Sequence, residues 1–385
     1  MTTKSPKDGA SQANPSTRSI ARPAVLAVLC TMAVNQPEFA FAAGENSPTA
    51  TTSDNAEPVP AVKTTRDGGE DRTFPDLKMT LENGVQFLPA TQYWTPAGFR
   101  PLTMDLYLPT TAPNDTRYPV IVFIHGGGWA RGDSRSSRPI ENFPGLLSHI
   151  SKRGYVVASI DYRLTGEAFW PAQGQDLKAA IKFLRMKADR YGIDPARIAT
   201  WGVSAGGHLS GIAASTAGVE QLKPQPLREN AVRTEDDVAR SPVSDAVQAA
   251  VSWYGGFNME TIAEQSRKPG MFSRDDKRAP EWGVLGCFQN ECSAEHLKSA
   301  SPVHYVDAKT APMLLVVGDA DVSIPHEQTL EMAEKMKAAK AEVELLVLPG
   351  ADHDFAGKDV GETQKNNQVA LDATLKFLDR VLKPK

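Results

Sequence analysis

The residues that could do chemistry begin with one serine, Ser204, in the stretch RIATWGVSAGGHLSGIAAS. Glycines stand two residues before and two residues after this serine, giving the pattern Gly202-Val203-Ser204-Ala205-Gly206. An apolar run precedes the pattern and small residues follow it, which is typical of a tight turn from a buried strand into a helix. Flanking glycines let the strand and helix approach closely, and the serine hydroxyl then projects above the sheet. The pattern predicts a nucleophilic serine; the alternative is a tight turn without a chemical role.

A glycine-rich loop earlier in the chain could stabilise the product of attack by such a serine. In the stretch VIVFIHGGGWARGD, three successive glycines follow an apolar run. Attack on a carbonyl makes its oxygen anionic, and backbone N–H groups aimed at that oxygen stabilise the charge. We therefore expect the N–H groups of Gly127, Gly128 and Ala205 to form an oxyanion hole. His125 is expected to be a structural hydrogen-bonding residue.

A serine nucleophile also needs a base, and the base needs a carboxylate to orient it. In a fold with this kind of turn the chain order is serine, then acid, then histidine. His353, in LPGADHDF, follows the last apolar run and is the candidate base. The preceding run, MLLVVGDADVSIP, offers Asp319 and Asp321 as the acid. His326 is expected to begin a helix at the surface.

The elements that must position these residues alternate between short apolar runs and helical patterns. Two earlier runs, VQFLPATQYW and LTMDLYLP, alternate apolar and polar residues and are expected to be antiparallel strands at a sheet edge. Later strands, expected to be buried on both faces, are VIVFIH, VVASIDY, RIATWG, VQAAVSWYG, MLLVVGD and VELLVLPG. The helical patterns are PAQGQDLKAAIKFLRMKADRYG, SAGGHLSGIAAS, PHEQTLEMAEKMKAAK and VGETQKNNQVALDATLKFLDRVLK. This alternation predicts an α/β fold with a mostly parallel sheet and helices on both faces.

One long segment, residues 257–305, interrupts the alternation at the end of a strand. It carries several large apolar residues, and an excursion of that length after a strand is typical of a cap or a pocket wall. We expect the substrate pocket to include Trp129 beside the triple glycine, and Trp253 and Tyr254 at the end of the strand before the insertion.

The N-terminal residues differ in composition from the rest of the chain. Residues 1–42 combine a long basic region, a short apolar run, PAVLAVLCTMAV, and the small-residue site Ala40-Phe41-Ala42. This is the pattern of a signal peptide, and it predicts a secreted or periplasmic protein; the alternative is a disordered tail with an apolar patch. Residues 43–73 lack periodicity and are expected to be a disordered linker, so the folded domain is predicted to cover 74–385.

After removal of residues 1–42, two cysteines remain, Cys287 and Cys292, in GCFQNEC. In an exported protein this pair is expected to form a disulfide. The alternative is a pair of free thiols that pack as small apolar groups.

Composition limits the classes of partner. The 385-residue chain has a net charge of −4 and an isoelectric point of about 6.0. It therefore offers no basic surface for nucleic acid or for an anionic membrane. The apolar run near the N-terminus is too short to span a bilayer, so no membrane span is expected.

These motifs carry a resemblance that covers some 280 residues, from about Leu102 to the C-terminus. The stretches are DLYLP, HGGGW, SIDYRL, PAQGQDLKAAIKFLR, YGIDPARIATWGVSAGGHL, SWYGG, SASPVHYV and GDADVSIP. The chain resembles an α/β-hydrolase. It is most similar to the BD-FAE branch of bifunctional feruloyl and acetyl-xylan esterase-like proteins, near the hormone-sensitive-lipase-like carboxylesterases.

The resemblance implies roles for residues that the motifs alone leave open. The acid of this family stands three residues after the glycine that ends the strand, so Gly318 points to Asp321. Asp161-Tyr162-Arg163 and Asp176 are implied to be structural. Where glycines often flank the histidine, this chain has Asp352 and Asp354, whose charges should raise the pKa of His353 and favour activity at neutral to alkaline pH.

The expected function is that of a secreted serine carboxylesterase with a Ser204-His353-Asp321 triad, an acyl-enzyme intermediate and no metal or organic cofactor. The expected substrate is a small-molecule or polysaccharide-linked ester, for example an acetylated or feruloylated polysaccharide. One alternative is an amide-bond hydrolase, either arylformamidase-like or peptidase-like. Another is a catalytically inactive binding protein, which is disfavoured because all three triad residues are present.

Overall fold

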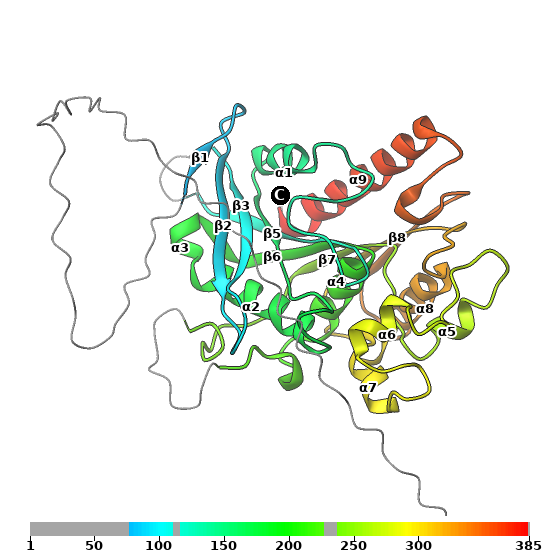
Figure 1. The fold of residues 1–385 in the computed structure, drawn as a ribbon. Coiled ribbons are helices and arrows are strands. Elements are labelled where there is room, and N and C mark those ends of the chain that lie inside the picture. The colour runs from blue at the N-terminus through cyan, green and yellow to red at the C-terminus, as the bar shows by residue number, and fades with distance from the viewer. Residues whose placement is uncertain (1–76, 111–115, 227–236, 384–385) are drawn as a thin grey trace, which may run out of the picture. The chain divides into compact units, whose positions relative to one another are not determined.

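The computed structural model of the protein describes residues 77–110, 116–226 and 237–383 (Figure 1). These residues belong to the compact unit Arg72–Lys385. The predicted signal peptide, 1–42, and the predicted linker, 43–73, lie outside the described residues.

The described residues form one nine-stranded sheet with the order β1-β2-β3-β5-β4-β6-β7-β8-β9. The first strands pair antiparallel, up to the β3–β5 pair, and every pair from β5–β4 to β8–β9 is parallel. The mostly parallel sheet with an antiparallel edge was predicted by the change from alternating to continuous apolar runs. The strands are β1 Met79–Thr80, β2 Gln86–Trp94, β3 Leu102–Leu108, β4 Tyr118–Ile124, β5 Val156–Ile160, β6 Ile193–Val203, β7 Ala249–Trp253, β8 Met313–Gly318 and β9 Val343–Leu348.

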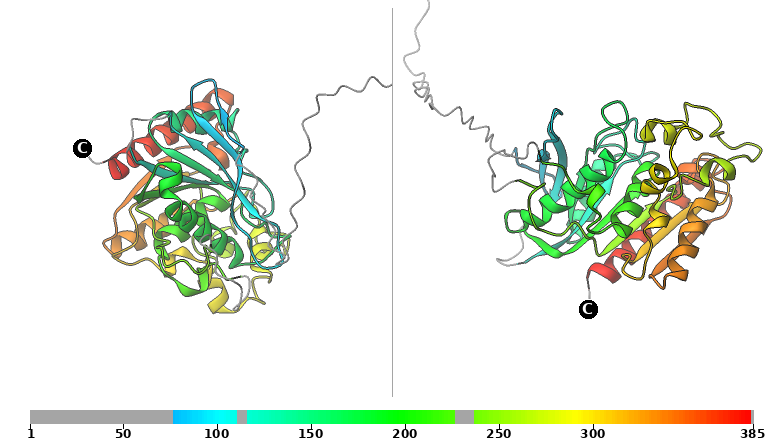
Figure 2. Two further views of the ribbon diagram at one scale, coloured as in Figure 1. Left: turned by 90° about the vertical axis from the view of Figure 1, so that its left-hand side faces the viewer. Right: turned by 90° about the horizontal axis from the view of Figure 1, so that it is seen from below.

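Helices cover both faces of this sheet, as Figures 1 and 2 show. One core cluster joins the sheet to α1 and α9, and the other joins it to α2, α4 and α8. The helices are α1 Phe143–Lys152, α2 Ala172–Met186, α3 Ala188–Tyr191, α4 Ala205–Ser215, α5 Ile262–Gln265, α6 Pro280–Leu285, α7 Ala294–Ser299, α8 His326–Ala338 and α9 Val360–Leu382.

Two local features differ from the sequence-based expectation. The helix α1 was not predicted; Pro144 in its first turn is tolerated there, because the first N–H groups of a helix have no partner inside the helix. The strand β9 was expected to be buried on both faces, and this was wrong. Among the described strands it is the last of the sheet and pairs only with β8, so side chains such as Glu344 and Leu345 are exposed.

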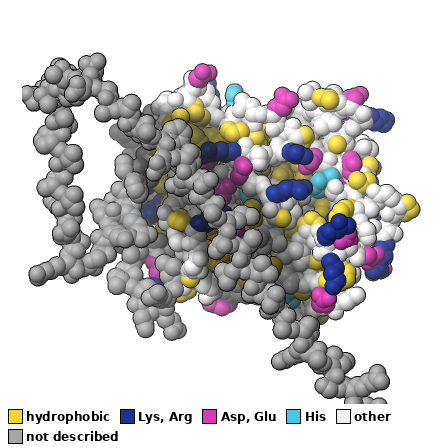
Figure 3. Space-filling view, viewed as in Figure 1, with side chains coloured by type: hydrophobic (Ala, Val, Ile, Leu, Met, Phe, Trp, Pro, Cys, Tyr) yellow, Lys and Arg dark blue, Asp and Glu magenta, His cyan; other side chains and the backbone are white. Residues whose placement is uncertain are grey.

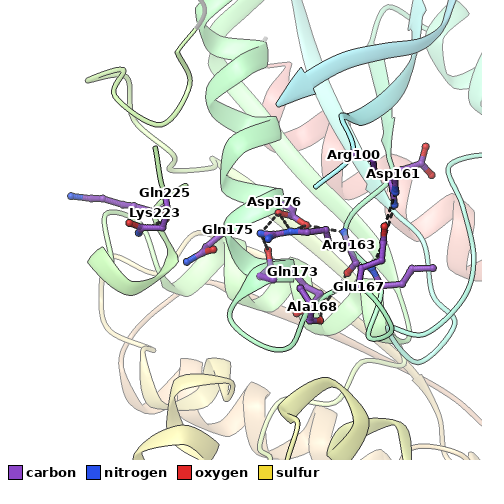
Figure 4. A network of polar contacts seen from close by, with 12 residues as sticks. Arg100, Asp161, Arg163, Glu167, Ala168, Gln173, Gln175, Asp176, Lys223 and Gln225 are labelled. Carbon is purple, nitrogen blue, oxygen red and sulfur yellow. Dashed lines mark hydrogen bonds and ion pairs between the residues drawn. The ribbon is translucent and has the colours of Figure 1, made fainter. Parts of the chain in front are cut away.

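A polar network ties the segment after β5 to α2, as Figure 4 shows. Further contacts tie the same segment to the loop after β4. The Arg163 guanidinium donates to the Asp176 carboxylate from Nη2 at 2.7 Å and from Nε at 2.9 Å, and the Arg163 backbone N–H donates to the same carboxylate at 2.7 Å. Tyr162 donates its hydroxyl to the His125 carbonyl, 3.1 Å away. Asp161 accepts from the backbone N–H of Ser134 at 2.7 Å. These contacts hold the glycine-rich loop against the sheet, which is the structural role that the resemblance implied.

The Arg163–Asp176 pair generates a stability prediction. Both side chains are almost fully buried, with 7% and 0% of their surface exposed. Asp176→Asn would leave the guanidinium buried without a counter-charge, so the free energy of unfolding should fall by about 3–5 kcal/mol. Urea unfolding followed by tryptophan fluorescence would measure this loss. The measurement belongs at about pH 8, where carboxylates are ionised.

The control is Asp189→Asn. Asp189 pairs with Arg117 at 2.7 Å, but its side chain is 97% exposed. Removing this charge should leave the free energy of unfolding almost unchanged, because exposed pairs contribute little. Equal losses in the two variants would contradict the structural role of the buried pair.

Candidate active site

The turn between β6 and α4 consists of Ser204 alone, and its backbone is strained. Ser204 has φ 53° and ψ −117°, in a region that residues other than glycine rarely adopt. A Cβ atom at Gly202 would lie 2.0 Å from the carbonyl oxygen of Gly206. A Cβ atom at Gly206 would lie 2.0 Å from the carbonyl oxygen of Ile124. Both positions therefore require glycine, and their close contacts hold the serine at the carboxyl end of the sheet.

Three side chains predicted from separate motifs meet at this turn. The Ser204 Oγ lies 3.1 Å from Nε2 of His353, and Nδ1 of His353 lies 2.8 Å from Oδ2 of Asp321. Since a carboxylate only accepts, Nδ1 carries the proton and Nε2 is free to accept the serine proton. The other oxygen of Asp321 accepts from the N–H groups of Ser323 and Ile324, each at 2.8 Å. The geometry is that of a nucleophile, a base and an orienting acid.

The alternative acid, Asp319, lies in the same loop but does not touch the histidine. Its Oδ1 accepts from the backbone N–H of Gly350 at 2.6 Å, and its side chain is exposed. The structure thus brings Asp321, and not Asp319, into contact with His353. His326 begins α8 and is partly exposed, as expected.

The electrostatic surroundings favour the protonated form of His353. Burial lowers its pKa, but the hydrogen bond and charge of Asp321 outweigh burial, and the charges of Asp354 and Asp352 add to them. The net effect raises the pKa of His353 above its ordinary value. Burial also raises the pKa of the Asp354 carboxyl, while the positive charge of Arg138 acts to lower it.

The backbone amides predicted to bind an oxyanion line the same cavity as Ser204. Within the described part of the chain, the N–H groups of Gly127, Gly128 and Ala205 have no hydrogen-bond acceptor. His125, which directly precedes the glycines in the chain, is buried; its Nδ1 donates to the Gly126 carbonyl at 2.7 Å, and burial lowers its pKa. These contacts give His125 a structural position, and the free amides are available to a ligand.

Ser204 and His353 open into a cavity of about 1110 Å³. One side is formed by the glycine-rich loop and the other by the insertion, residues 257–305. The insertion is fixed to the loops that carry the site, because the Phe272 N–H donates to the Val322 carbonyl at 2.8 Å and Pro280 packs against Gly128. The residues of the insertion that line the cavity are Phe272, Arg274, Lys277, Arg278, Ala279, Pro280, Glu281 and Gly283.

The predicted pocket residues divide into one that lines this cavity and two that do not. Trp129 borders it. Trp253 was predicted there and this was wrong: its ring points to the face covered by α1 and α9, where Nε1 donates to Thr374 Oγ1 at 2.9 Å. The prediction for Tyr254 was also wrong, because its buried ring packs behind His353 with the ring centres 4.7 Å apart. In each case the backbone at the strand end decides which way the side chain points.

The insertion also differs in detail from the apolar wall that its sequence indicated. Met259 and Trp282 belong to the core, whereas Phe272 lines the cavity.

Between α6 and α7, Cys287 and Cys292 are joined by an S–S bond of 2.04 Å.

Sequence reasoning missed the charged residues around the cavity. Arg131 and Arg138 lie on the loop that begins with the triple glycine, and Lys277 and Arg278 lie on the insertion. The only sequence signal is that basic residues follow the glycines in GGGWARGDSRSSR. Their gathering around one cavity depends on the tertiary structure.

Two broader properties of the described residues bear on the chemistry. No cluster of three or more His, Cys, Asp or Glu side chains among them is arranged to hold a metal ion. Across residues 77–110, 116–226 and 237–383, none of the helices combines the length and apolar character needed to cross a bilayer.

Comparison with known proteins gives the family. The BD-FAE family model matches residues 104–336, which is more than half of the chain. The chain belongs to the BD-FAE family. The match includes the glycine-rich loop, Ser204 and Asp321 and stops before His353.

The curated relatives and the solved structures to which this BD-FAE protein is similar bear esterase names. It is 32% identical to Esterase LipC of Mycobacterium tuberculosis over 62% of this chain and 53% of LipC, and 30% identical to Esterase LipQ of the same organism over 71% of this chain and 58% of LipQ. The chain thus spans little more than half the length of these relatives.

Two solved structures share the α/β-hydrolase fold. One is a truncated carbohydrate esterase from gut microbiota, with a TM-score of 0.53 and 28% identity, covering 71% of this chain and 91% of that one. The other is a thermophilic esterase, Est2, of Thermogutta terrifontis, with a TM-score of 0.57 and 26% identity, covering 77% of this chain and 94% of that one. The fold of this chain is therefore that of an α/β-hydrolase.

The charges around His353 generate a prediction about pH. The base must be neutral to accept a proton, so activity should fall as the pH drops through the pKa of His353. Asp354→Asn removes a charge that raises this pKa, so the acid limb of kcat/KM should move to lower pH, by less than about one unit. Asparagine suits the position because it tolerates the φ of 59° found at Asp354.

The measurement is the pH profile of kcat/KM on a neutral ester at low ionic strength, where screening is weak. Asp372→Asn is the control, because it removes the same charge from an exposed site on α9. An acid limb that moves equally in both variants, or in neither, would contradict a local effect of Asp354.

Proposed function

We propose that this protein is a serine carboxylesterase that uses a Ser204-His353-Asp321 triad. The observation that carries the proposal is the continuous contact from Ser204 Oγ through His353 to the buried Asp321 carboxylate, at 3.1 and 2.8 Å, beside amides with no acceptor in the described residues. The esterase names of the relatives and of the solved structures support it.

The proposed reaction proceeds in two halves. His353 Nε2 takes the proton of the Ser204 hydroxyl while Oγ bonds to the ester carbonyl carbon. The carbonyl oxygen becomes anionic and accepts hydrogen bonds from Gly127, Gly128 and Ala205. The C–O bond to the alcohol then breaks, and His353 returns the proton to the departing oxygen. Water repeats the cycle on the acyl-enzyme and releases the acid.

Asp321 acts in both halves through the histidine. It keeps the Nδ1–H tautomer in place and stabilises the imidazolium that forms in each half. Its own position is fixed by two backbone N–H donors, so the imidazole need not reorient during the reaction.

We propose a small-molecule or polysaccharide-linked ester as the substrate. The cavity beside Ser204 is wide and is lined by polar and charged side chains as well as by Trp129 and Phe272. One of the similar solved structures is named as a carbohydrate esterase, and another as a bifunctional GH43-CE protein of Bacteroides eggerthii. An ester group on a sugar or an aromatic acid would suit such a lining.

Labelling and kinetics of Ser204→Ala test the proposal. A fluorophosphonate probe should label the wild-type protein and not the variant, because the probe reacts with an activated serine. On 4-nitrophenyl acetate, the variant should lose about 10⁴ to 10⁶ in kcat. Retained labelling, or faster turnover of N-formylkynurenine or a peptidyl anilide than of the ester, would contradict the proposal; the second outcome would favour an amide-bond hydrolase.

Paired substitutions in the acid loop serve as a control. Asp321→Asn should greatly lower kcat, because it removes the carboxylate that fixes the histidine tautomer. Asp319→Asn, two residues away, should retain most of the activity, because Asp319 contacts Gly350 and not His353.

We also propose export of this protein and a disulfide between Cys287 and Cys292 in the exported form. The basic and apolar segments of residues 1–42 support export, and the S–S bond between the cysteines is compatible with an oxidising compartment. Mass spectrometry of protein recovered from the periplasm or the medium should find residues 1–42 removed and a cross-linked peptide before reduction. An intact N-terminus or two free thiols would contradict this.

A further inference from the structure

We propose that the cavity above Ser204 selects esters that carry a carboxylate near the scissile bond, and that Arg131 and Arg138 recognise this group. The inference rests on the proposed esterase function and adds a substrate class to it. It follows from the position of the basic side chains, from the partners of neighbouring arginines, and from the balance of charge in the cavity.

Arg131 and Arg138 lie on one loop, line the cavity and are exposed. Neither forms an ion pair within the part of the chain that the structure describes. Arg135, on the same loop, differs: its Nε donates to the buried carboxylate of Asp105 at 2.6 Å. One arginine of the loop therefore supports the fold, and the two that line the cavity keep their charge available to a ligand.

Each of these arginines lies beside a part of the reaction centre. A Cβ atom at Gly127 would lie 3.1 Å from Cγ of Arg131, so the first part of the Arg131 side chain lies beside Gly127, one of the residues of the expected oxyanion hole. Arg138 lines the cavity together with Asp354, the residue that follows His353, and its positive charge acts against the rise in the pKa of Asp354 that burial causes. Because Ser204, Arg131 and Arg138 all line this cavity, a substrate held at Ser204 would share it with both cations.

The opposite side of the cavity adds to the positive charge. Lys277 and Arg278 are exposed there, and their carboxylate partners, Glu291 and Asp276, do not line the cavity. Arg274 is buried and paired with Glu281 at 2.9 Å, so it contributes little net charge. Among the described residues, five Lys and Arg side chains and three carboxylates line the cavity.

This balance is opposite to that of the chain, whose net charge is −4. On the face drawn in Figure 3, Lys and Arg side chains are interspersed with Asp and Glu side chains. A cleft lined by one sign of charge concentrates its field and attracts ligands of the opposite sign. Arginine also matches a carboxylate with two parallel N–H donors, which a neutral sugar hydroxyl cannot use fully. The cavity is therefore suited to an ester that bears a carboxylate.

Two matched pairs of esters test the inference on the full-length protein. In the first pair the charge is on the alcohol side: 4-acetoxybenzoate against 4-acetoxybenzamide. In the second pair the charge is on the acyl side: the mono-4-nitrophenyl ester of adipic acid is compared with the same 4-nitrophenyl ester whose free carboxyl group is methylated. The quantity measured is the ratio of kcat/KM for the anionic ester to kcat/KM for the neutral ester. Comparing this ratio between variants removes the intrinsic reactivity of each ester.

In the Arg131→Gln/Arg138→Gln variant, the ratio should fall about three- to tenfold for at least one pair of esters. Arg131→Lys/Arg138→Lys should keep most of the ratio, because the charge remains. Raising the ionic strength from about 10 mM to about 500 mM should lower the wild-type ratio. Arg267→Gln is the control. Arg267 is an exposed residue of the insertion 257–305 that pairs with Asp275 and does not line the cavity, so the ratio should not change.

A ratio that stays within about twofold of the wild-type value in the Arg→Gln double variant, for both pairs of esters, would overturn the inference. If the neutral esters are still hydrolysed in a Ser204-dependent way, the proposed esterase function stands while the substrate class fails. If the wild-type protein hydrolyses none of the four esters and the fluorophosphonate probe does not label Ser204, the proposed function itself fails.

Discussion

The site depends on how closely three backbone segments approach one another at Gly202 and Gly206. The end of β6, the start of α4 and the end of β4 meet there with no room for a side chain, since a Cβ atom at either glycine would overlap a carbonyl oxygen. This contact puts the Ser204 hydroxyl, the first amide of α4 and the glycine-rich loop at one point above the sheet. It also forces Ser204 into a left-handed backbone conformation, which the surrounding packing must stabilise.

Buried charge supports this arrangement from two directions. The Arg163–Asp176 pair and the Tyr162 hydroxyl hold the segment after β5 and the carbonyl of His125, directly before the glycine-rich loop. On the other side, two backbone N–H groups fix the Asp321 carboxylate, and that carboxylate fixes His353. Polar groups buried in this way are favourable only when each is paired, so the network specifies one geometry. The reacting groups are positioned before any substrate binds.

The cavity combines a wall on the rigid sheet with a wall that belongs to the insertion. Contacts of Pro280 with Gly128 and of Phe272 with Val322 tie the insertion to the glycine-rich loop and to the loop that carries Asp321. Because the sheet side carries the reacting groups and their supporting network, the insertion can change the lining without disturbing the chemistry. In this chain the lining is rich in basic side chains.

The sequence by itself determined the features that depend on local backbone requirements. These include the strand–turn–helix around Ser204, the glycine-rich loop, the alternation that gives a mostly parallel sheet, and the position of His353 after the last strand. Among the residues alone, Asp319 and Asp321 were equivalent candidates, and only the resemblance favoured Asp321. Asp321 contacts His353, 32 residues further along the chain, because the loop after β8 and the loop after β9 lie side by side. Tertiary structure likewise decided that Trp253 and Tyr254 point away from the cavity, that β9 is an edge strand, and that Arg131 and Arg138 face the site. Sequence patterns reflect the conformational requirements of residues that are close together in the chain. The features decided by tertiary structure depend instead on which distant segments of the chain pack together.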